Sequence, residues 1–290
     1  MEEEYTGWKI WSPTDEELVD LFQNGECPLD LKENEYLIIE DRVDGSRNNI
    51  YKKKGDKIEK INRAPIKIKD PKDGRCVKTY VPRNPEQACA FDMLHDSTTT
   101  VKLITGRFGS GKTLMLVTAG LEALKEKKFD KIVWIRNNID VKDTQGLGYL
   151  PGTAEEKLWP YLGPFVDHVG ETSKVEKMLK EGELDIQPLQ FLRGRNIERS
   201  LIICTESQNM TLDHLALIIA RAAEGTEVWF DGDFKQYDRT AFERSKGLEK
   251  MVQRLKGDSL FGYVKLTKTE RSKTAALADK LDEVSLNNGT

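Results

Sequence analysis

Short apolar runs alternate with amphipathic stretches along the second part of the chain. The runs have the length and the β-branched, aromatic character of buried strands, and the stretches between them repeat their apolar residues at helical spacing. Strands are predicted at residues 101–106, 131–136, 201–204, 227–231 and 263–267, and helices at 88–94, from 112 to about 127, from 153, and at 174–182, 211–223, 247–256 and 272–281. This alternation indicates an α/β fold in which helices cover both faces of a parallel sheet. Ligands of such sheets bind at the carboxyl ends of the strands, so functional residues are expected at that edge.

The first eighty residues follow a different pattern. A helix is predicted at residues 8–24, where Leu18 and Leu21 contribute to an apolar face. Short alternating stretches predict strands at residues 35–40, from 49 and at 57–61, with a turn at 44–46. These elements indicate a small β-rich module over residues 1–81, ahead of a larger domain over residues 82–290.

The composition is that of a globular protein with a strongly charged surface, at 38% hydrophobic and 32% charged residues. No apolar run approaches the length of a membrane span, and the acidic start MEEEY differs from the basic start of a signal peptide. The four cysteines lack CxxC spacing, which argues against a zinc site or a disulfide framework. We therefore expect a cytoplasmic protein that does not associate with membranes.

The formal net charge of −4 conceals an uneven distribution. The chain is acidic over residues 1–41 and basic over residues 51–78. A basic stretch of this kind is either an ordinary solvated face or a footprint for the phosphate backbone of a nucleic acid. Composition leaves both interpretations open.

A phosphate-binding sequence follows the first strand of the larger domain. Residues 106–113 read GRFGSGKT and match the pattern G-x-x-x-x-G-K-[ST] in full. Glycines let consecutive backbone N–H groups turn around a polyphosphate, and the next helix directs its positive end to the same point. Lys112 supplies a charge for the β and γ phosphates, and the Thr113 hydroxyl can join the coordination shell of Mg²⁺. The predicted nucleoside triphosphate and Mg²⁺ site comprises Gly106, Arg107, Phe108, Gly109, Ser110, Gly111, Lys112 and Thr113.

Polar residues follow the later strands at the same edge of the predicted sheet. Glu206 comes just after the apolar run LIIC, Asp231 and Gln236 lie at and beyond the next strand end, and Arg271 follows the last strand. P-loop enzymes keep at such positions carboxylates for Mg²⁺ and water, a group that senses the γ-phosphate, and an arginine that stabilises the transition state. Each residue alone is as easily a turn residue or part of a surface ion pair. Their order behind the phosphate-binding sequence is what favours catalysis.

Longer segments resemble one family. The segments PRNPEQACAFDML, ITGRFGSGKTLM, LQFLRGRNIERSLIICTESQNMT and ARAAEGTEVWFDGDFKQYD are similar to the PhoH family of ATPases, especially the branch in which the ATPase follows a PIN ribonuclease domain. The resemblance runs from Pro82 to Ser272. It implies a RecA-like P-loop core like that of superfamily one helicases. It also implies that the subunits assemble into a hexameric ring with ATP at the subunit interfaces.

The resemblance also implies roles for single residues. Gln87 would read the adenine, and Lys112 and Thr113 would hold phosphates and Mg²⁺. Glu206 would be the catalytic base, Gln236 would sense the γ-phosphate and Arg271 would be the arginine finger. The two arginines of the stretch RGR at residues 193–195 would contact nucleotide or nucleic acid, or form an ion pair at an interface, and these alternatives stay open.

This chain departs from the family pattern among the residues expected to bind Mg²⁺. The family usually reads DEAQN where this chain has Thr205-Glu206-Ser207-Gln208-Asn209, so the aspartate beside Mg²⁺ is absent. Asp231 stands where the family commonly has a small uncharged residue. In a RecA-like sheet its strand lies between the strand before the phosphate-binding loop and the strand before Glu206. We therefore predict that Asp231 supplies the missing carboxylate, beside Thr113 and Glu206 as groups on the metal.

Two further departures limit what the resemblance implies. Residues 136–140 read RNNID in place of the usual arginine–proline sequence of a loop that faces nucleic acid, which leaves the substrate preference open. The N-terminal module is too short for a PIN domain and resembles the small β module that joins PIN to ATPase in fused proteins. Ribonuclease activity is therefore not expected.

Three functions are compatible with these residues. The first is a ring-forming, Mg²⁺-dependent ATPase that moves on or remodels single-stranded nucleic acid, RNA in preference to DNA. The second is a nucleotide-binding switch or scaffold with weak hydrolysis, because Thr205 replaces a carboxylate. The third is a small-molecule phosphotransferase, against which the GDxxQ element at residues 232–236 and the length of the resemblance both speak.

Overall fold

The computed structural model describes residues 4–24, 27–40, 48–61, 66–69, 76–136 and 159–269. The helix predicted from residue 153, the loop after Arg136, the helix predicted at 272–281 and Arg271 lie outside the described residues. These stay predictions.

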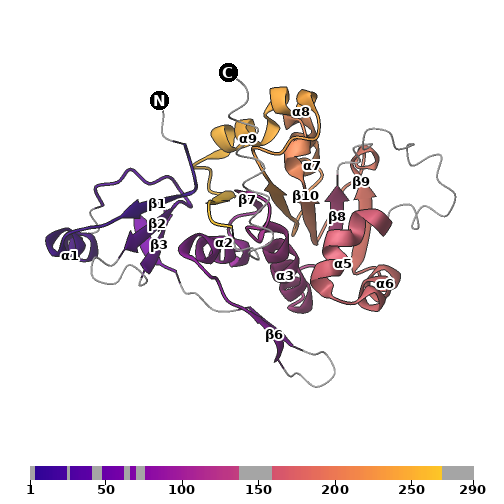
Figure 1. The fold of residues 1–290 in the computed structure, drawn as a ribbon, viewed down its shortest axis with the longest axis horizontal. Helices are drawn as coiled ribbons and strands as arrows, with labels where there is room; N and C mark the ends of the chain where they lie inside the picture. Colours follow the sequence, from indigo (N-terminus) through magenta and orange to yellow (C-terminus); the bar gives the residue numbers. More distant parts are fainter. Residues whose placement is uncertain are drawn as a thin grey trace, which may run out of the picture.

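The larger domain is built on a six-stranded sheet in which all neighbours are parallel (Figure 1). Its strands are β7 (Val101–Gly106), β8 (Lys131–Arg136), β9 (Leu184–Pro188), β10 (Ser200–Thr205), β11 (Glu227–Gly232) and β12 (Phe261–Leu266). The order across the sheet is β12-β7-β11-β10-β8-β9, so β11 lies between β7 and β10, as predicted. This is a RecA-like P-loop core. β9, the short outer strand, is absent from the sequence prediction because its residues LDIQP do not form an apolar run.

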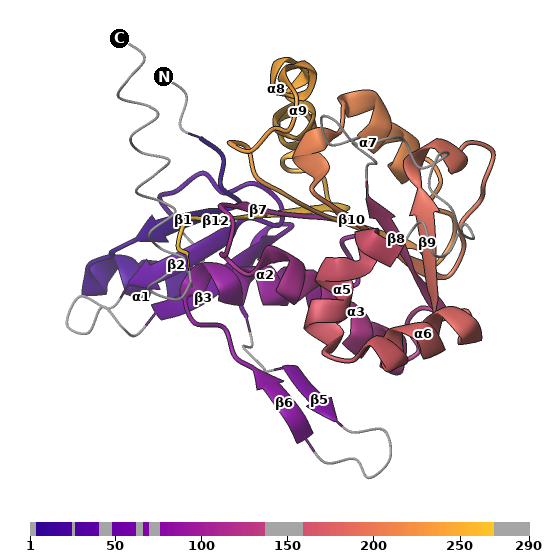
Figure 2. The ribbon, with the colours of Figure 1, turned by 45° about the vertical axis from the view of Figure 1, so that its right-hand side comes forward.

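Alternate strand residues face opposite sides of this sheet, and helices cover both sides (Figure 2). Ile104, Trp134 and Ile203 pack into the core on one side, and Leu103 and Ile202 into the core on the other. The first side carries α2 (Pro85–His95), α3 (Lys112–Lys125), α5 (Gly163–Val169) and α6 (Thr172–Glu181), and the second carries α7 (Leu212–Ile219) and α9 (Gly247–Leu255), with α8 (Thr240–Ser245) beside α9. The helices predicted at 174–182 and 247–256 are thus confirmed as α6 and α9.

A second, four-stranded sheet forms the N-terminal end of the molecule. It contains β1 (Trp8–Trp11), β2 (Tyr36–Glu40), β3 (Asn48–Lys54) and β4 (Lys57–Lys60) in that order, with α1 (Asp15–Asn24) beside them. The prediction of a single helix over residues 8–24 is wrong, because Trp8–Trp11 pair in parallel with β2. Pro13 disfavours a helical conformation at Ser12. Thr14 and Glu17 then start the helix by reciprocal capping, with Glu17 N donating to Thr14 Oγ1 at 3.2 Å and Thr14 N donating to Glu17 Oε2 at 2.6 Å.

The N-terminal segment covers the free edge of the six-stranded sheet at β12. Lys265 N donates to the carbonyl oxygen of Thr6 at 2.9 Å, and Trp8 Nε1 donates to the carbonyl oxygen of Lys265 at 2.8 Å. A Cβ on Gly7 would lie 1.8 Å from the carbonyl oxygen of Tyr263, so only glycine allows this approach. Covering the edge removes a row of unpaired backbone groups from solvent and joins the two sheets.

Buried polar contacts reinforce the junction between the two sheets. Asn34, 2% exposed, donates from Nδ2 to three backbone carbonyl oxygens between residues 258 and 261, at 3.0 to 3.2 Å. Lys52 Nζ lies 2.5 Å from Asp96 Oδ2, and Lys54 Nζ lies 2.7 Å from the same atom. Burial opposes the charged form of Asp96, but the hydrogen bonds from the two lysines prevail and hold the pKa of this carboxyl well below its usual range. The module is therefore anchored to α2 and to the turn before β12.

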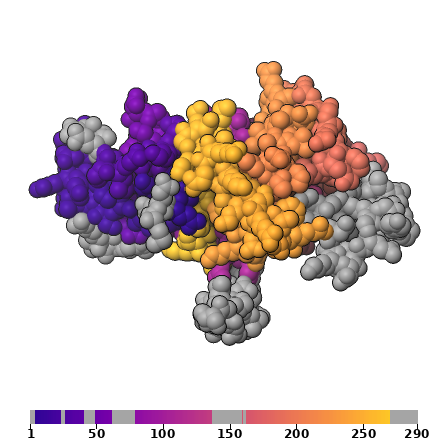
Figure 3. Space-filling model, turned by 90° about the horizontal axis from the view of Figure 1, so that it is seen from above, coloured from indigo at the N-terminus to yellow at the C-terminus, as the bar shows by residue number. Residues whose placement is uncertain are grey.

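A two-stranded antiparallel ribbon links the module to α2. It consists of β5 (Ile66–Lys69) and β6 (Cys76–Tyr80) and projects from the body of the molecule (Figures 2 and 3). The sequence pattern did not predict this ribbon, because each strand is only a few residues long.

In the described part of the chain, none of the helices is both long enough and apolar enough to span a membrane.

We expect Asn34→Ala to destabilise the protein, because it removes a buried amide that donates to three backbone carbonyl oxygens at the junction of the two sheets. The free energy of unfolding should fall by about 1–3 kcal/mol, and the melting temperature by several degrees in a thermal melt. Asn49→Ala, at an exposed position of β3, is the matched control. Equal melting temperatures for the two variants would contradict this account of the junction.

Candidate nucleotide-binding site

The phosphate-binding loop joins β7 to α3, as the sequence predicts. Gly109 and Gly111 have φ values of +74° and +92°, a left-handed conformation that glycine adopts without strain. At Gly106 a Cβ would lie 2.6 Å from the carbonyl oxygen of Leu266, so the loop also needs glycine to pack against the end of β12. These conformations turn the backbone of the loop toward the N-terminus of α3, where its N–H groups can meet an anion.

Side chains of the loop hold its closed shape. Lys112 Nζ donates to the carbonyl oxygens of Gly106 at 2.5 Å and Arg107 at 3.0 Å. The Ser110 hydroxyl, almost fully buried, donates to the same carbonyl oxygen of Arg107 at 2.8 Å. Arg107 and Phe108 are half-buried in the turn. The Lys112 ammonium therefore already lies across the mouth of the loop, where bound phosphates would replace carbonyl oxygens as its partners.

Gln87 lies against the phosphate-binding loop. It belongs to the first turn of α2, where Asn84 caps the helix by accepting a hydrogen bond from Gln87 N at 2.9 Å. Its side-chain Nε2 donates to the carbonyl oxygen of Ser110 at 3.1 Å, and its Oε1 accepts from Arg83 N at 3.0 Å. The residue predicted to read the adenine is therefore next to the loop. Contact with a base would exchange one of these bonds for a bond to the ligand.

Asp231 connects the loop to the strand end that precedes Glu206. Its Oδ2 accepts from the Thr113 hydroxyl at 2.6 Å, and its Oδ1 accepts from Glu206 N at 2.8 Å. The side chain is only 1% exposed. Burial, and next the charge of Glu206, raise the pKa of Asp231 to about 6, while Lys112 and the hydrogen bonds from Thr113 and Glu206 oppose the rise.

The side chain of Thr205, unlike that of Asp231, makes no hydrogen bond to a described residue. It is 2% exposed at the end of β10, and its hydroxyl oxygen has no hydrogen-bond partner among the described residues. A buried hydroxyl without a partner costs free energy. The contact with Thr113 is made from β11 by Asp231, while Thr205 takes no part in it.

Glu206 leaves β10 in a left-handed conformation, with φ +54° and ψ +40°. Such a conformation is unfavourable for a residue with a side chain and is concentrated at functional sites. The Glu206 side chain is exposed, and Gln208 Nε2 donates to its Oε2 at 2.7 Å. Gln208 Oε1 in turn accepts from Asp233 N at 3.1 Å. Gln208 thus fixes the Glu206 carboxylate relative to the loop after β11.

The loop after β11 carries Gln236, and a second pair of bonds holds it. Asn209 Nδ2 donates to Asp238 Oδ2 at 2.6 Å, and Asp238 N donates to Asn209 Oδ1 at 2.9 Å. Gln236 lies in the chain between the two residues bonded in this way, Asp233 and Asp238, and its side chain is exposed. The structure therefore places Gln236 and Glu206 on neighbouring, mutually bonded segments, while Arg271 lies outside the described residues.

Glu86 holds the chain segment that leads toward Arg271. This carboxylate is 5% exposed and accepts from Thr267 Oγ1 at 2.5 Å, from Thr267 N at 2.6 Å and from Lys268 N at 3.4 Å. Gln87, its neighbour in α2, binds the phosphate-binding loop. One turn of α2 therefore fixes both the loop and the exit of β12.

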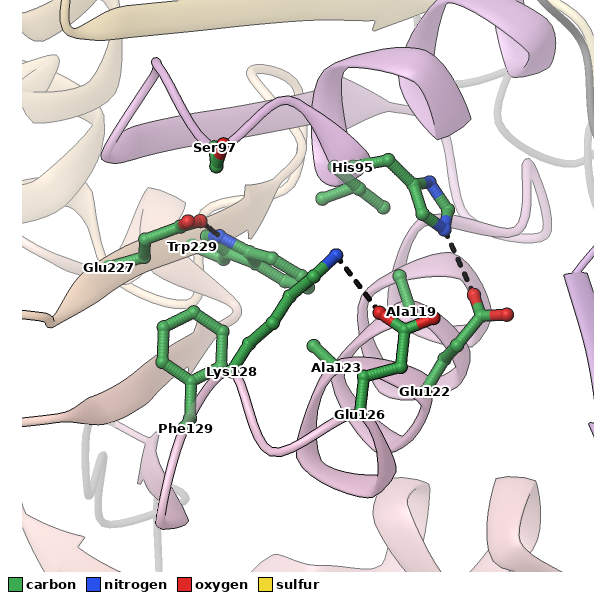
Figure 4. A pocket seen from close by; sticks show the side chains of 11 residues that line it. His95, Ser97, Ala119, Glu122, Ala123, Glu126, Lys128, Phe129, Glu227 and Trp229 are labelled. Carbon is green, nitrogen blue, oxygen red and sulfur yellow. Dashed lines mark hydrogen bonds and ion pairs between the residues drawn. The ribbon is translucent and has the colours of Figure 1, made fainter.

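A shallow pocket lies at the other end of the sheet, lined by the end of α3 and the start of β11 (Figure 4). Its charged side chains and the Trp229 indole are already paired, with His95 Nε2 2.9 Å from Glu122, Lys128 Nζ 3.0 Å from Glu126, and Trp229 Nε1 donating to Glu227 at 2.7 Å. It is separate from the phosphate-binding loop and holds none of the predicted site residues.

Comparison with known proteins agrees with this geometry. A family model described as PhoH-like protein matches residues 79–281. The chain belongs to the PhoH family. Within the described residues, the part before residue 79 is the four-stranded sheet with most of the ribbon, and no PIN domain is evident in it.

Several curated proteins are similar to this PhoH-family chain. "Protein PhoH2" of Thermobispora bispora is 32% identical over 202 residues, which cover 69% of this chain and 46% of that protein. "Protein PhoH2" of Bacillus subtilis is 33% identical over 210 residues, which cover 69% of this chain and 47% of that protein. The chain thus spans about half the length of the curated relatives it matches. Among solved structures, the Pif1 helicase of Candida albicans aligns with 70% of this chain and 44% of that chain, at a TM-score of 0.35 and 16% identity.

Sequence reasoning missed three groups in this PhoH-family site: Glu86, Gln208 and the pair Asn209 and Asp238. Each works through a partner far away in the sequence, such as Thr267 for Glu86, and no local pattern reports such a contact. The one available signal was the position of each residue next to an expected site residue, Glu86 beside Gln87 and Gln208 near Glu206.

We expect Glu86→Ala to destabilise the protein, because a buried carboxylate with three donors is removed and two backbone N–H groups are left without an acceptor. The free energy of unfolding should fall by about 2–4 kcal/mol in a denaturant titration. Glu122→Ala removes an exposed pair with His95 and should cost less than about 1 kcal/mol. A smaller loss for Glu86→Ala than for Glu122→Ala would contradict the assignment.

The raised pKa of Asp231 predicts an unusual pH dependence. The folded carboxyl binds its proton more tightly than the unfolded one, so it contributes a loss of stability as pH rises from about 4 to about 6. Asp231→Asn removes this contribution. Without nucleotide or metal, the variant should gain stability relative to the parent protein across this window, by on the order of 2–3 kcal/mol.

Urea titrations from pH 4 to pH 8 measure this difference. Asp56→Asn, at an exposed turn, is the matched control and should show no such trend. A stability difference for Asp231→Asn that does not change with pH would contradict the prediction.

Proposed function

We propose that this chain is a Mg²⁺-dependent ATPase that works as a hexameric ring on single-stranded nucleic acid, RNA in preference to DNA. One observation carries the proposal. The Asp231 carboxylate accepts hydrogen bonds from the Thr113 hydroxyl of the phosphate-binding loop and from the Glu206 backbone N–H, so it links the start of α3 to the strand end that carries Glu206. Membership of the PhoH family supports the same conclusion.

The binding of ATP follows from the loop. Its backbone N–H groups and the N-terminus of α3 would hold the phosphates, and Lys112 would move from the carbonyl oxygens of Gly106 and Arg107 to the β and γ phosphates. Gln87 would read the adenine from its position against Ser110.

The residues present fit Mg²⁺. Thr113, Asp231 and Glu206 offer only oxygen ligands, which this cation prefers, and Mg²⁺ keeps several waters and phosphate oxygens as its remaining ligands. When bound, Mg²⁺ would neutralise charge on the β and γ phosphates.

Hydrolysis would use the exposed groups at the strand ends. Glu206, oriented by Gln208, would accept a proton from the attacking water. Gln236 would sense the γ-phosphate from the adjoining loop, and Arg271 would stabilise charge in the transition state, from within the subunit or from a neighbour.

We further propose that Asp231 has taken the role that the family gives to an aspartate at position 205. The distance of 2.6 Å from Thr113 Oγ1 to Asp231 Oδ2 supports this, and so does the Thr205 hydroxyl, which has no hydrogen-bond partner in the described part of the chain. The second candidate function, a nucleotide-binding switch or scaffold with weak hydrolysis, is favoured by Thr205, an uncharged residue where the family has an aspartate.

Steady-state ATP hydrolysis tests the leading proposal. The purified protein should turn over ATP with Mg²⁺, single-stranded RNA should stimulate it more than DNA, and Glu206→Gln should lower the rate at least 100-fold with ATP binding retained. Binding of ATP without turnover on either polymer would instead establish the switch or scaffold.

A carboxylate swap tests the role of Asp231. Asp231→Ala should lower Mg²⁺-dependent turnover by about 10- to 100-fold, because the group that orients Thr113 is lost. Thr205→Asp in the parent protein should also impair it, since a third carboxylate would join Asp231 and Glu206. The double variant T205D/D231A should recover at least part of the activity lost in D231A. Unchanged Mg²⁺-dependent turnover in D231A would end the proposal.

A further inference from the structure

The segment between β9 and β10, residues 189–197, is an anchored loop on the surface of the ATPase domain. Leu189, Leu192 and Ile197 are 8%, 0% and 6% exposed and pack into the core beneath α7 and α9. Backbone bonds from Leu192 N to Leu189 O and from Ile197 N to Arg221 O, at 3.2 and 2.9 Å, fix its course. In Figure 2 the chain after β9 turns back along the outer side of the sheet toward β10. The loop has three buried anchors and therefore one outward face.

The outward face presents an aromatic ring and two cations. Phe191 is 61% exposed, and Arg193 and Arg195 are both exposed. Gly194 between the arginines has φ +78° and open space around its Cβ position, which lets the chain turn there without strain. We name Phe191, Arg193 and Arg195 the aromatic–arginine face.

The two arginines of the aromatic–arginine face have no side-chain partner among the described residues, whereas a nearby arginine does. Arg199, a few residues along the same chain, binds Asp130 with two hydrogen bonds of 2.8 and 3.1 Å. Neither Arg193 nor Arg195 forms an ion pair with a described residue. A large apolar ring and two unpaired guanidinium groups held outward together are the complement of a ligand with flat faces and negative charge.

We propose that the aromatic–arginine face binds a single strand of nucleic acid, with Phe191 stacking on a base and Arg193 and Arg195 contacting phosphates. Base–aromatic stacking and arginine–phosphate contacts are how proteins hold single strands without reading sequence. β9 runs parallel to β7 and β10, and Pro188 at its end lies opposite Arg136 at the end of β8. The loop therefore starts at the same edge of the sheet as the phosphate-binding loop, with a further cation beside it. This inference rests on the proposed function and adds where the strand binds.

Fluorescence anisotropy with labelled single-stranded RNA and DNA of the same sequence tests the proposal. It is carried out with the full chain, Mg²⁺ and a non-hydrolysable ATP analogue, over a series of salt concentrations. We expect R193A/R195A to weaken binding of both polymers at least tenfold and to reduce the slope of log affinity against log salt by about 1.4, the value for two lost phosphate contacts on a single strand. Phe191→Ala should weaken binding about tenfold and leave that slope unchanged.

The control is K177A/K180A, which removes two charges from the exposed side of α6. It should leave both affinity and slope at the parent values. Binding of the ATP analogue is measured in parallel, and we expect it to be the same in all variants. Weaker binding of the analogue to R193A/R195A would assign the two arginines to the nucleotide and overturn the inference.

The outcomes separate this inference from the proposed function. Unchanged affinity and salt slope in R193A/R195A overturn the inference alone. If that variant also has an altered sedimentation coefficient, the arginines belong to a contact between copies of the chain. A parent protein that binds neither polymer overturns both the inference and the nucleic-acid part of the proposed function, while ATP binding and turnover are judged separately. A larger effect on one polymer identifies which one the face accepts.

Discussion

The carboxylate of Asp231 is the contact on which the candidate site depends. It is one side chain with two partners, a hydroxyl at the start of α3 and a backbone N–H at the end of β10. Only the strand order makes this possible, because β11 lies between β7 and β10 and its end reaches both neighbours. The alternation of strand residues between two helical layers buries both faces of this sheet and leaves its carboxyl edge as the place where polar strand ends meet. The position of Asp231 thus depends on the strand order of the sheet as well as on the apolar pattern of the chain.

Features that cost stability gather around the same carboxylate. Asp231 is buried with a raised pKa, Glu206 has a left-handed backbone, and the hydroxyl of Thr205 is buried without a described partner. Each is unfavourable for folding, and elsewhere in a core such features are rare. Their presence together beside a phosphate-binding loop supports the proposal that this edge of the sheet binds nucleotide and metal.

Much of this was open to prediction from the sequence. The phosphate-binding loop and five of the six strands of the parallel sheet have strong local patterns, and the place of β11 followed from the fold class. The strand Trp8–Trp11 cannot be told from the start of a helix by its pattern, because four residues show too little periodicity, and its assignment depends on the pairing with β2. Contacts such as Glu86 with Thr267, or Gln208 with Asp233, join residues that only the fold brings together. Arg271 lies outside the described residues and stays a prediction.

The central claim is that the metal-side carboxylate has moved from β10 to β11. It is tested most directly by the affinity for a non-hydrolysable ATP analogue, measured by calorimetry at increasing Mg²⁺ in the parent protein, Asp231→Ala and Thr205→Ala. We predict that Mg²⁺ tightens binding in the parent protein and in Thr205→Ala but has little effect in Asp231→Ala. A loss of the Mg²⁺ effect in Thr205→Ala, with the effect retained in Asp231→Ala, would contradict the claim.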